Sequence, residues 1–136
     1  MADRTFIDTN VLVYADDASG RKGEQARTVL SATIRAGTAV ISTQVLQEYY
    51  AVATRKRGVD LAFARTNVAL YARLDVIGID AAMVLAAIDL HGRHGLSIWD
   101  ALIVRAAVVG GCRRLLSEDL NAGQVIEGVR VENPFA

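Results

Sequence analysis

Four acidic residues stand at the ends of short apolar segments or at the start of a helical pattern. They are Asp8, Glu48, Asp100 and Asp119. If the apolar segments 4–7, 39–42 and 112–117 form parallel strands, all four carboxylates reach the carboxyl edge of one sheet, where open α/β folds bind ligands. Carboxylate oxygens are hard ligands of the kind that suits Mg²⁺ or Mn²⁺. The pattern therefore predicts a divalent-metal site.

Each acid also has a local structural explanation. Asp100 lies three residues after Ser97 and could complete a helix cap, and Asp119 could do the same after another serine. Asp8 could belong to a turn, and Glu48 could be a solvated helix residue. The joint placement of the four acids at one predicted sheet edge weakens these separate explanations. On topology alone, both interpretations stay open.

The elements that must position these acids follow from hydrophobic spacing and from helix start and stop residues. Strands are predicted at 5–7, 38–42, 74–79, 114–117 and 129–131, and helices at 24–35, 43–57, 60–73, 80–92 and 101–109. Asp60 and Asp80 are residues that cap helices, and Gly37 and Gly58 are typical helix stops. Strands that alternate with helices indicate an α/β fold with a mostly parallel central sheet flanked by helices.

Length and composition predict one domain spanning residues 1–136. The 136 residues are 52% hydrophobic, which is ample for a single core, and the only proline is Pro134. Neither a signal segment nor an apolar run of about 18 residues is present, so we expect no membrane span and a cytoplasmic protein. The lone cysteine, Cys112, excludes an intramolecular disulfide and is expected to be a buried thiol.

The charges balance at 15 basic and 15 acidic residues, which excludes a generic polyanion-binding protein. Arg55, Lys56 and Arg57 form a basic cluster that could contact a nucleic-acid backbone. The alternative is a solvated helix end that compensates the helix dipole. A helix that runs away from the sheet edge is expected to carry this cluster away from the acids.

Four segments around the acids resemble the four motifs of the PIN-domain ribonucleases, and most closely those of the VapC-type toxins. The segments are 6–12, 47–50, 97–104 and 116–120. By this resemblance Asp8, Glu48, Asp100 and Asp119 are the catalytic and metal-binding positions, and Asn10 and Ser117 are supporting polar residues. The ligand role falls on Asp119 rather than on Glu118, which is expected to face solvent.

The resemblance implies a PIN-like three-layer fold and a Mg²⁺- or Mn²⁺-dependent endoribonuclease, the toxin of a toxin–antitoxin pair. It further implies a homodimer, an RNA substrate and an antitoxin protein whose C-terminal segment blocks the groove. The alternatives are a housekeeping RNA-processing or DNA-directed nuclease of the same fold and a binding module that does not cleave. Phosphate-loop, zinc-protease and serine-esterase motifs are missing from the sequence, so it favours none of those classes.

Histidines and aromatic residues near the acids need separate interpretation. His91 and His94 are expected to be solvated or to compensate a helix dipole, so no histidine pair is positioned to produce a cyclic phosphate. Hydrolysis by water, which leaves a 5′-phosphate, is therefore expected. Tyr49, Tyr50 and Trp99 could stack on bases, although aromatic residues at helical spacing usually belong to a core.

Overall fold

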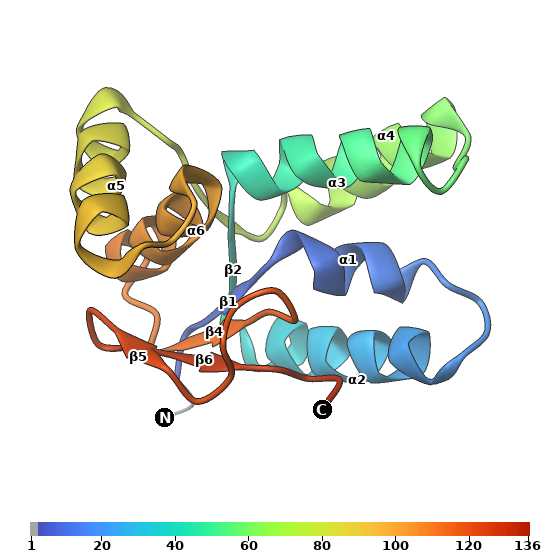
Figure 1. The fold of residues 1–136 in the computed structure, drawn as a ribbon. Helices are drawn as coiled ribbons and strands as arrows, with labels where there is room; N and C mark the ends of the chain where they lie inside the picture. Colours follow the sequence, from blue (N-terminus) through green and yellow to red (C-terminus); the bar gives the residue numbers. More distant parts are fainter. Residues whose placement is uncertain (1–2) are drawn as a thin grey trace.

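The computed structural model describes residues 3–136, in which six strands form one sheet with helices on both sides (Figure 1). The strands are β1 (Thr5–Ile7), β2 (Ala39–Ser42), β3 (Asp75–Ile77), β4 (Arg114–Leu116), β5 (Val125–Ile126) and β6 (Val129–Glu132). The helices are α1 (Thr9–Ala15), α2 (Arg21–Ala36), α3 (Thr43–Arg55), α4 (Leu61–Tyr71), α5 (Ala81–His94) and α6 (Ile98–Val109). The predicted α/β fold with a mostly parallel sheet is confirmed.

The strand order β3-β2-β1-β4-β6-β5 places β1 at the centre of the sheet. All neighbouring pairs are parallel except β5 and β6, which form an antiparallel pair at one side. In the register, Phe6 of β1 lies between Val40 of β2 and Leu115 of β4, and all three side chains are fully buried. Because these strands run in one direction, the residues that follow them share the carboxyl edge.

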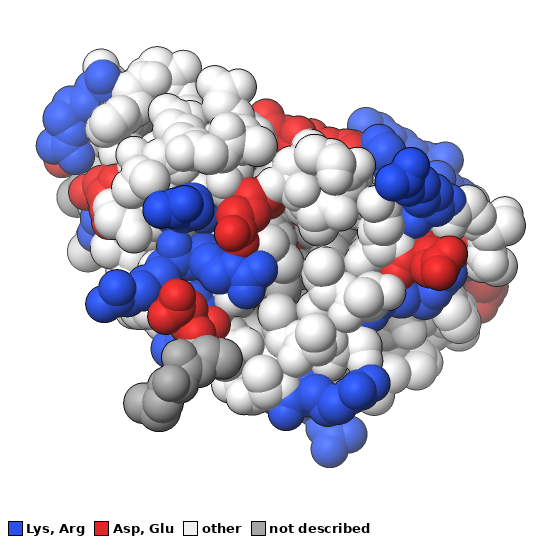
Figure 2. All heavy atoms as spheres, turned by 90° about the horizontal axis from the view of Figure 1, so that it is seen from below, with Lys and Arg blue, Asp and Glu red and all other residues white. Residues whose placement is uncertain are grey.

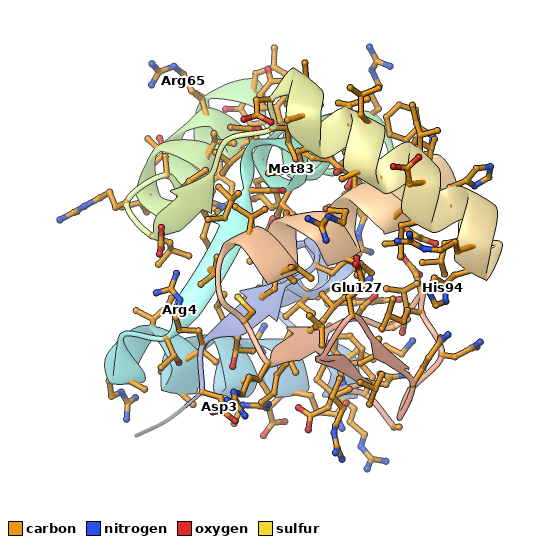
Figure 3. The ribbon with its side chains drawn as sticks, turned by 90° about the vertical axis from the view of Figure 1, so that its left-hand side faces the viewer. Asp3, Arg4, Arg65, Met83, His94 and Glu127 are labelled. Atoms are coloured by element: carbon orange, nitrogen blue, oxygen red, sulfur yellow. The ribbon has the colours of Figure 1, made fainter. Side chains whose placement is uncertain are left out.

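Helices cover both faces of the sheet and extend beyond its carboxyl edge. Helix α6 packs against the sheet with α5 outside it, and α2 lies on the opposite side (Figures 1 and 3). The end of α6 lies so close to β2 that a Cβ at Gly110 would approach Val40 Cγ1 to 3.1 Å. Helices α1 and α3 leave β1 and β2 and pack against each other. The sheet edge therefore opens between α1, α3 and the start of α6.

The structure differs from the sequence prediction at several boundaries. Helix α1 was not predicted, because its seven residues bury Val11, Leu12 and Val13 and leave little polar face to reveal a helical period. The hairpin strand β5 has two residues and was also missed. Helix α5 continues to His94, and Gly95 with a positive φ of 67°, rather than Gly92, ends it.

Two predictions about the rest of the chain can be compared with the structure. Cys112 is buried, as expected, and burial raises the pKa of its thiol to about 11, so the group stays protonated at neutral pH. None of the helices between residues 3 and 136 combines the length and apolar character that crossing a membrane requires.

Candidate metal and nucleic-acid site

The first predicted acid, Asp8, is buried at the junction between β1 and α1. It is the N-cap residue of α1, and its Oδ1 accepts a hydrogen bond from the backbone N–H of Thr9 at 2.7 Å. Its Oδ2 accepts a hydrogen bond from the hydroxyl of Ser117 at 2.7 Å. Because β1 and β4 are neighbours, the ends of these two strands bring Asp8 and Ser117 together. The turn proposed for this segment is in fact a helix start.

Asn10 connects the ends of β1 and β4 from the first turn of α1. Its Nδ2 lies 3.2 Å from Asp119 Oδ2 and 3.5 Å from Asp8 Oδ2, and its Oδ1 accepts a hydrogen bond from the backbone N–H of Glu118 at 3.3 Å. The hydroxyl of Ser117 also accepts a hydrogen bond from the Asp119 backbone N–H at 3.1 Å. The structure thus places Asp8 and Asp119 within hydrogen-bond reach of one asparagine nitrogen.

Glu48 approaches the same edge from the second turn of α3. Its Oε1 accepts a hydrogen bond from the hydroxyl of Thr9 at 2.9 Å, and its Oε2 lies 3.4 Å from Gln44 Nε2. The same Gln44 amide donates to the backbone carbonyl of Trp99 at 3.1 Å. Gln44 therefore joins α3 to the start of α6. The sequence pattern does not single out Thr9 or Gln44, although Gln44 stands one helical turn before Glu48.

Asp100 lies in the first turn of α6 and is half-buried. The helix cap is made by Ser97, whose hydroxyl accepts a hydrogen bond from the Asp100 backbone N–H at 3.1 Å. Burial raises the pKa of the Asp100 carboxyl, the hydroxyl of Ser97 opposes this rise, and the charge of Asp119 adds to it. Asp100 is therefore within electrostatic reach of Asp119.

The electrostatics of the site are dominated by acids without basic partners. Burial raises the pKa of Asp8 to about 6, and hydrogen bonds from Ser117 and Thr9 oppose that rise. The charges of Asp119 and Glu48 raise the pKa of Asp8 further. Within residues 3–136, none of the four predicted acids forms a salt bridge with a lysine, arginine or histidine. A bound cation would relieve this repulsion.

The arrangement of the acids bears directly on whether they suit a metal ion. Among the described residues, no three acidic, histidine or cysteine side chains meet around one point closely enough to enclose an ion. Glu48 is instead held by Thr9 and Gln44, whereas Asp8 and Asp119 share Asn10. Mg²⁺ is usually held by one or two carboxylates and completes its shell with water and substrate phosphate oxygens. The oxygen donors present fit Mg²⁺ or Mn²⁺ in this open mode.

A groove of about 470 Å³ runs from the acids along α1 and α3. Glu48 and Asp119 line one end, and Lys56 and Arg57 line the other. Arg55 is exposed and does not line the groove. The helix does carry the cluster away from the acids, as expected, yet two of its three residues share one groove with them. The reason is that α1 packs beside α3, so the groove between them follows both helices.

Glu118 was expected to face solvent, but its carboxylate contacts two side chains. The hydroxyl of Tyr14 donates to its Oε1 at 2.8 Å, and the ammonium of Lys22 contacts its Oε2 at 2.6 Å. These contacts from α1 and α2 fix the segment that carries Asp119. Tyr14 and Lys22 are thus supporting residues, and no sequence spacing connects either of them to position 118.

The three aromatic residues near the acids have different environments. Tyr49 is fully buried, which fits the interpretation that it belongs to the core. Trp99 is 62% exposed and Tyr50 is 38% exposed, so that interpretation is wrong for Trp99. His94 lies at the exposed end of α5 (Figure 3), and neither histidine lines the groove.

Comparisons with known proteins complete the description of the site. The family model of the PIN domain matches residues 5–126. The fold is similar to Mycobacterium tuberculosis VapC20, described as a sarcin–ricin-loop-cleaving toxin, with a TM-score of 0.73 and 21% identity over 93% of this chain and 98% of that chain. It is also similar to a chain of a toxin–antitoxin complex from Klebsiella pneumoniae, with a TM-score of 0.70 and 21% identity over 96% and 98%.

A third similar structure is the DNA-bound VapBC of Salmonella typhimurium, with a TM-score of 0.70 and 19% identity over 98% of this chain and 99% of that chain. A search of curated protein sequences gave no significant match. The structural likenesses, all at low identity, concern the fold. The family match spans the segments that contain all four acids.

Proposed function

Because the chain belongs to the PIN-domain family, we propose that it is a metal-dependent endoribonuclease that hydrolyses phosphodiester bonds of RNA. The observation that carries the proposal is the gathering of Asp8, Asp119, Glu48 and Asp100 at one sheet edge without a basic partner among the described residues. Acids that repel one another lower the stability of the fold, but together they can bind a cation. The groove beside them has room for a polymer strand.

Each residue of the site has a distinct part in this proposal. Asp8 and Asp119 hold Mg²⁺ or Mn²⁺, and Glu48 and Asp100 complete the negative surface around it. Once bound, such an ion lowers the pKa of a coordinated water and neutralises charge on the scissile phosphate.

The neighbouring polar residues keep the carboxylates in place. The hydroxyl of Ser117 and the amide of Asn10 both lie against Asp8 Oδ2, which keeps that carboxylate in one orientation. Hydrolysis by water leaves a 5′-phosphate and a 3′-hydroxyl, and no histidine lines the groove to support a cyclic-phosphate route.

We also propose that the protein acts in the cytoplasm as the toxin of a toxin–antitoxin pair. The similar structures include toxin–antitoxin complexes, and the groove offers a place where an antitoxin segment would block access to the acids. The alternatives are a housekeeping RNA-processing nuclease, a DNA-directed nuclease and a binding module that does not cleave. A small gene directly upstream that encodes a protein able to form a complex with this chain would favour the toxin.

A homodimer belongs to the same proposal. Several large apolar side chains of α4 and α5 are exposed, and exposed apolar surface is typical of protein–protein interaction sites. These side chains are Leu61, Phe63, Leu70, Leu85 and Ile88. Light scattering at micromolar concentration is expected to give the dimer mass, and Leu85→Glu on α5 is expected to shift it toward the monomer. A monomer mass for the unmodified protein would contradict the dimer.

The direct test uses purified protein and total cellular RNA. We expect new 5′-phosphate ends in the presence of Mg²⁺ or Mn²⁺ and none with EDTA. Asp8→Asn and Asp100→Asn should remove the cleavage, whereas Asp89→Asn, which neutralises an exposed acid of α5 outside the groove, should keep it. A DNA oligonucleotide incubated in parallel tests the DNA-directed alternative, which predicts cleavage of the DNA. Cleavage by both site variants, or full activity in EDTA, would refute the metal site.

A further inference from the structure

The groove between α1 and α3 has two chemically different ends. Glu48 and Val52 of α3 and its C-cap residue Lys56 follow one another at spacings of four residues, so they lie along one face of the helix. Eight residues at 1.5 Å each put the basic end about 12 Å from the acidic end along the helix axis. One continuous surface therefore presents carboxylates, then an apolar stretch, then cations.

The apolar stretch is made by both helices. Val13 of α1 and Ala51 and Val52 of α3 line the groove between its two ends. No charged side chain of α3 lies between Glu48 and Arg55, and the nearby Lys22 ammonium is paired with Glu118, so neither offers a phosphate a free positive charge there. A sugar or a base can lie against this surface without losing hydrogen bonds. The charged ends and the apolar middle of the groove thus match a nucleic-acid strand, in which charged phosphates alternate with sugars and bases.

The two basic residues at the far end of the groove, Lys56 and Arg57, have different contacts within the protein. Arg57 contacts Asp17 at 2.9 Å, and its guanidinium carbon lies 5.6 Å from the centroid of the Tyr14 ring. Both contacts hold the guanidinium in place before a ligand arrives. Lys56 is exposed, and its side chain has neither a hydrogen bond nor a salt bridge to the described residues. Its full charge therefore remains available to an anion.

Two arginines outside the groove are paired with acids, as Arg57 is with Asp17. Arg114 contacts Glu132 at 2.5 Å, and Arg105 contacts Glu127 at 2.9 Å. On the face seen from below in Figure 2, basic and acidic side chains lie intermixed. Lys56 and Arg57 differ from these arginines because they share a groove with the candidate metal site.

We propose that Lys56 and Arg57 bind a second phosphate of a single RNA strand, separate from the phosphate that is cleaved. This inference rests on the proposed nuclease function and deepens it, because it defines the path of the substrate from the acids along α1 and α3. The path follows the groove of about 470 Å³ between these two helices. Arg55 is exposed outside the groove and takes no part in binding this phosphate. Only two residues of the basic cluster therefore belong to the phosphate site.

The substitution Lys56→Ala tests the site, with Arg55→Ala as the matched control that removes the same charge one residue away. Both are made in an Asp8→Asn background with Mg²⁺ present, and binding of a labelled 12-nucleotide single-stranded RNA is measured across a salt series. Lys56→Ala and Arg57→Ala are each expected to weaken binding and to lower the salt slope by about 0.7, the value for one lost contact to a single strand. Arg55→Ala is expected to leave both nearly unchanged, and Lys56→Arg to restore them.

A dinucleotide, which carries a single internal phosphodiester, sharpens the test. Its binding is expected to be insensitive to Lys56→Ala, because it cannot reach both ends of the groove. In the otherwise unmodified enzyme, Lys56→Ala is expected to raise KM for the 12-nucleotide RNA with kcat unchanged. Lys56 makes no contact that the fold requires, so thermal melting of this variant should match that of the parent protein.

Two results would overturn the second phosphate site while leaving the nuclease intact. One is an equal loss of affinity for Arg55→Ala and Lys56→Ala, which would mean that general positive charge attracts RNA. The other is cleavage by Lys56→Ala with unchanged KM. That result would mean that Lys56 and Arg57 bind an acidic segment of a protein partner and not the RNA. Failure of the unmodified protein to cleave any RNA with Mg²⁺ or Mn²⁺ would instead refute the proposed function and the site with it.

Discussion

The two ends of helix α1 carry two carboxylates with opposite surroundings. Asp8, at the N-terminal end, is buried and lies within reach of two further acids. Asp16, at the C-terminal end, accepts a hydrogen bond from the hydroxyl of Tyr49 at 2.6 Å and another from the amide of Asn67 at 3.3 Å. Burial raises the pKa of both groups, but only Asp8 faces acids from other elements across the site.

This difference separates a binding group from a structural group. Asp16 receives donors from α3 and α4 and thereby ties both helices to α1. Asp8 receives donors from Ser117 and Thr9, yet its position beside Asp119 and Glu48 makes its charge costly without a cation. The same residue type thus supports the fold at one end of a seven-residue helix and lowers its stability at the other.

The largest expected effect is on cleavage. Asp8→Asn keeps the shape of the side chain but removes its charge, so we expect the rate of RNA cleavage to fall to the level seen with EDTA. Asp16→Asn removes the same charge at the other end of α1 and should retain cleavage. Gel assays with matched protein concentrations measure both rates. Equal loss in the two variants would mean that Asp8 acts only through the fold.

The second effect is on the pH dependence of stability without metal. The pKa of Asp8 rises from 3.8 to about 6 on folding, so the folded state binds its proton more tightly than the unfolded state does. The resulting stabilisation is complete below about pH 4 and is lost as pH rises through 6. By linkage it amounts to roughly 2–3 kcal/mol. Melting curves in EDTA from pH 4 to 8 should therefore converge with those of Asp8→Asn at low pH and fall below them at neutral pH.

Magnesium provides the internal control for that measurement. Because a cation stabilises the ionised carboxylates, added Mg²⁺ should raise the melting temperature of the unmodified protein at pH 7 more than that of Asp8→Asn. Parallel pH curves for the two proteins in EDTA would contradict the assignment of the raised pKa to Asp8.

A smaller effect is expected at the structural end of α1. Asp16→Ala leaves the buried Tyr49 hydroxyl without its acceptor, at a cost of about 1–3 kcal/mol in the free energy of unfolding, while the Asn67 amide keeps its hydrogen bond to the Tyr49 oxygen. Urea unfolding measures this loss. Cleavage per folded molecule should stay unchanged, so Asp8 and Asp16 give opposite results in the two assays. An unchanged free energy of unfolding would show that water replaces Asp16 without loss.

The sequence predicts the place of a residue in the fold only where a local pattern, such as the end of a strand, determines that place. Acids at the ends of strands indicated the sheet edge, because parallel strands share one direction. Thr9 and Gln44 were missed since their roles depend on which helices lie side by side. The same reason explains why the sequence does not place Lys56 in one groove with the acids, because that depends on the packing of α1 beside α3.

The smallest expected effect concerns Tyr14, which lies on α1 between the two carboxylates. Its hydroxyl donates to Glu118, the residue before Asp119, so it positions a candidate ligand without touching it. Tyr14→Phe removes that bond but keeps the ring that packs on Phe135 at 5.0 Å. The Lys22 contact to Glu118 at 2.6 Å remains, so the loss should be partial.

We expect the Mg²⁺ concentration for half-maximal cleavage to rise by about tenfold or less in Tyr14→Phe, the lower end of what removing a residue behind a metal ligand costs. The rate at saturating Mg²⁺ should change little, because the ligands themselves are intact. Tyr50→Phe is the matched control, since Tyr50 is a partly exposed tyrosine that does not line the groove. If both variants shift the Mg²⁺ requirement equally, the hydrogen bond from Tyr14 to Glu118 does not position Asp119. If only Tyr14→Phe shifts it, α1 carries an ordering contact for the metal site as well as the ligand Asp8.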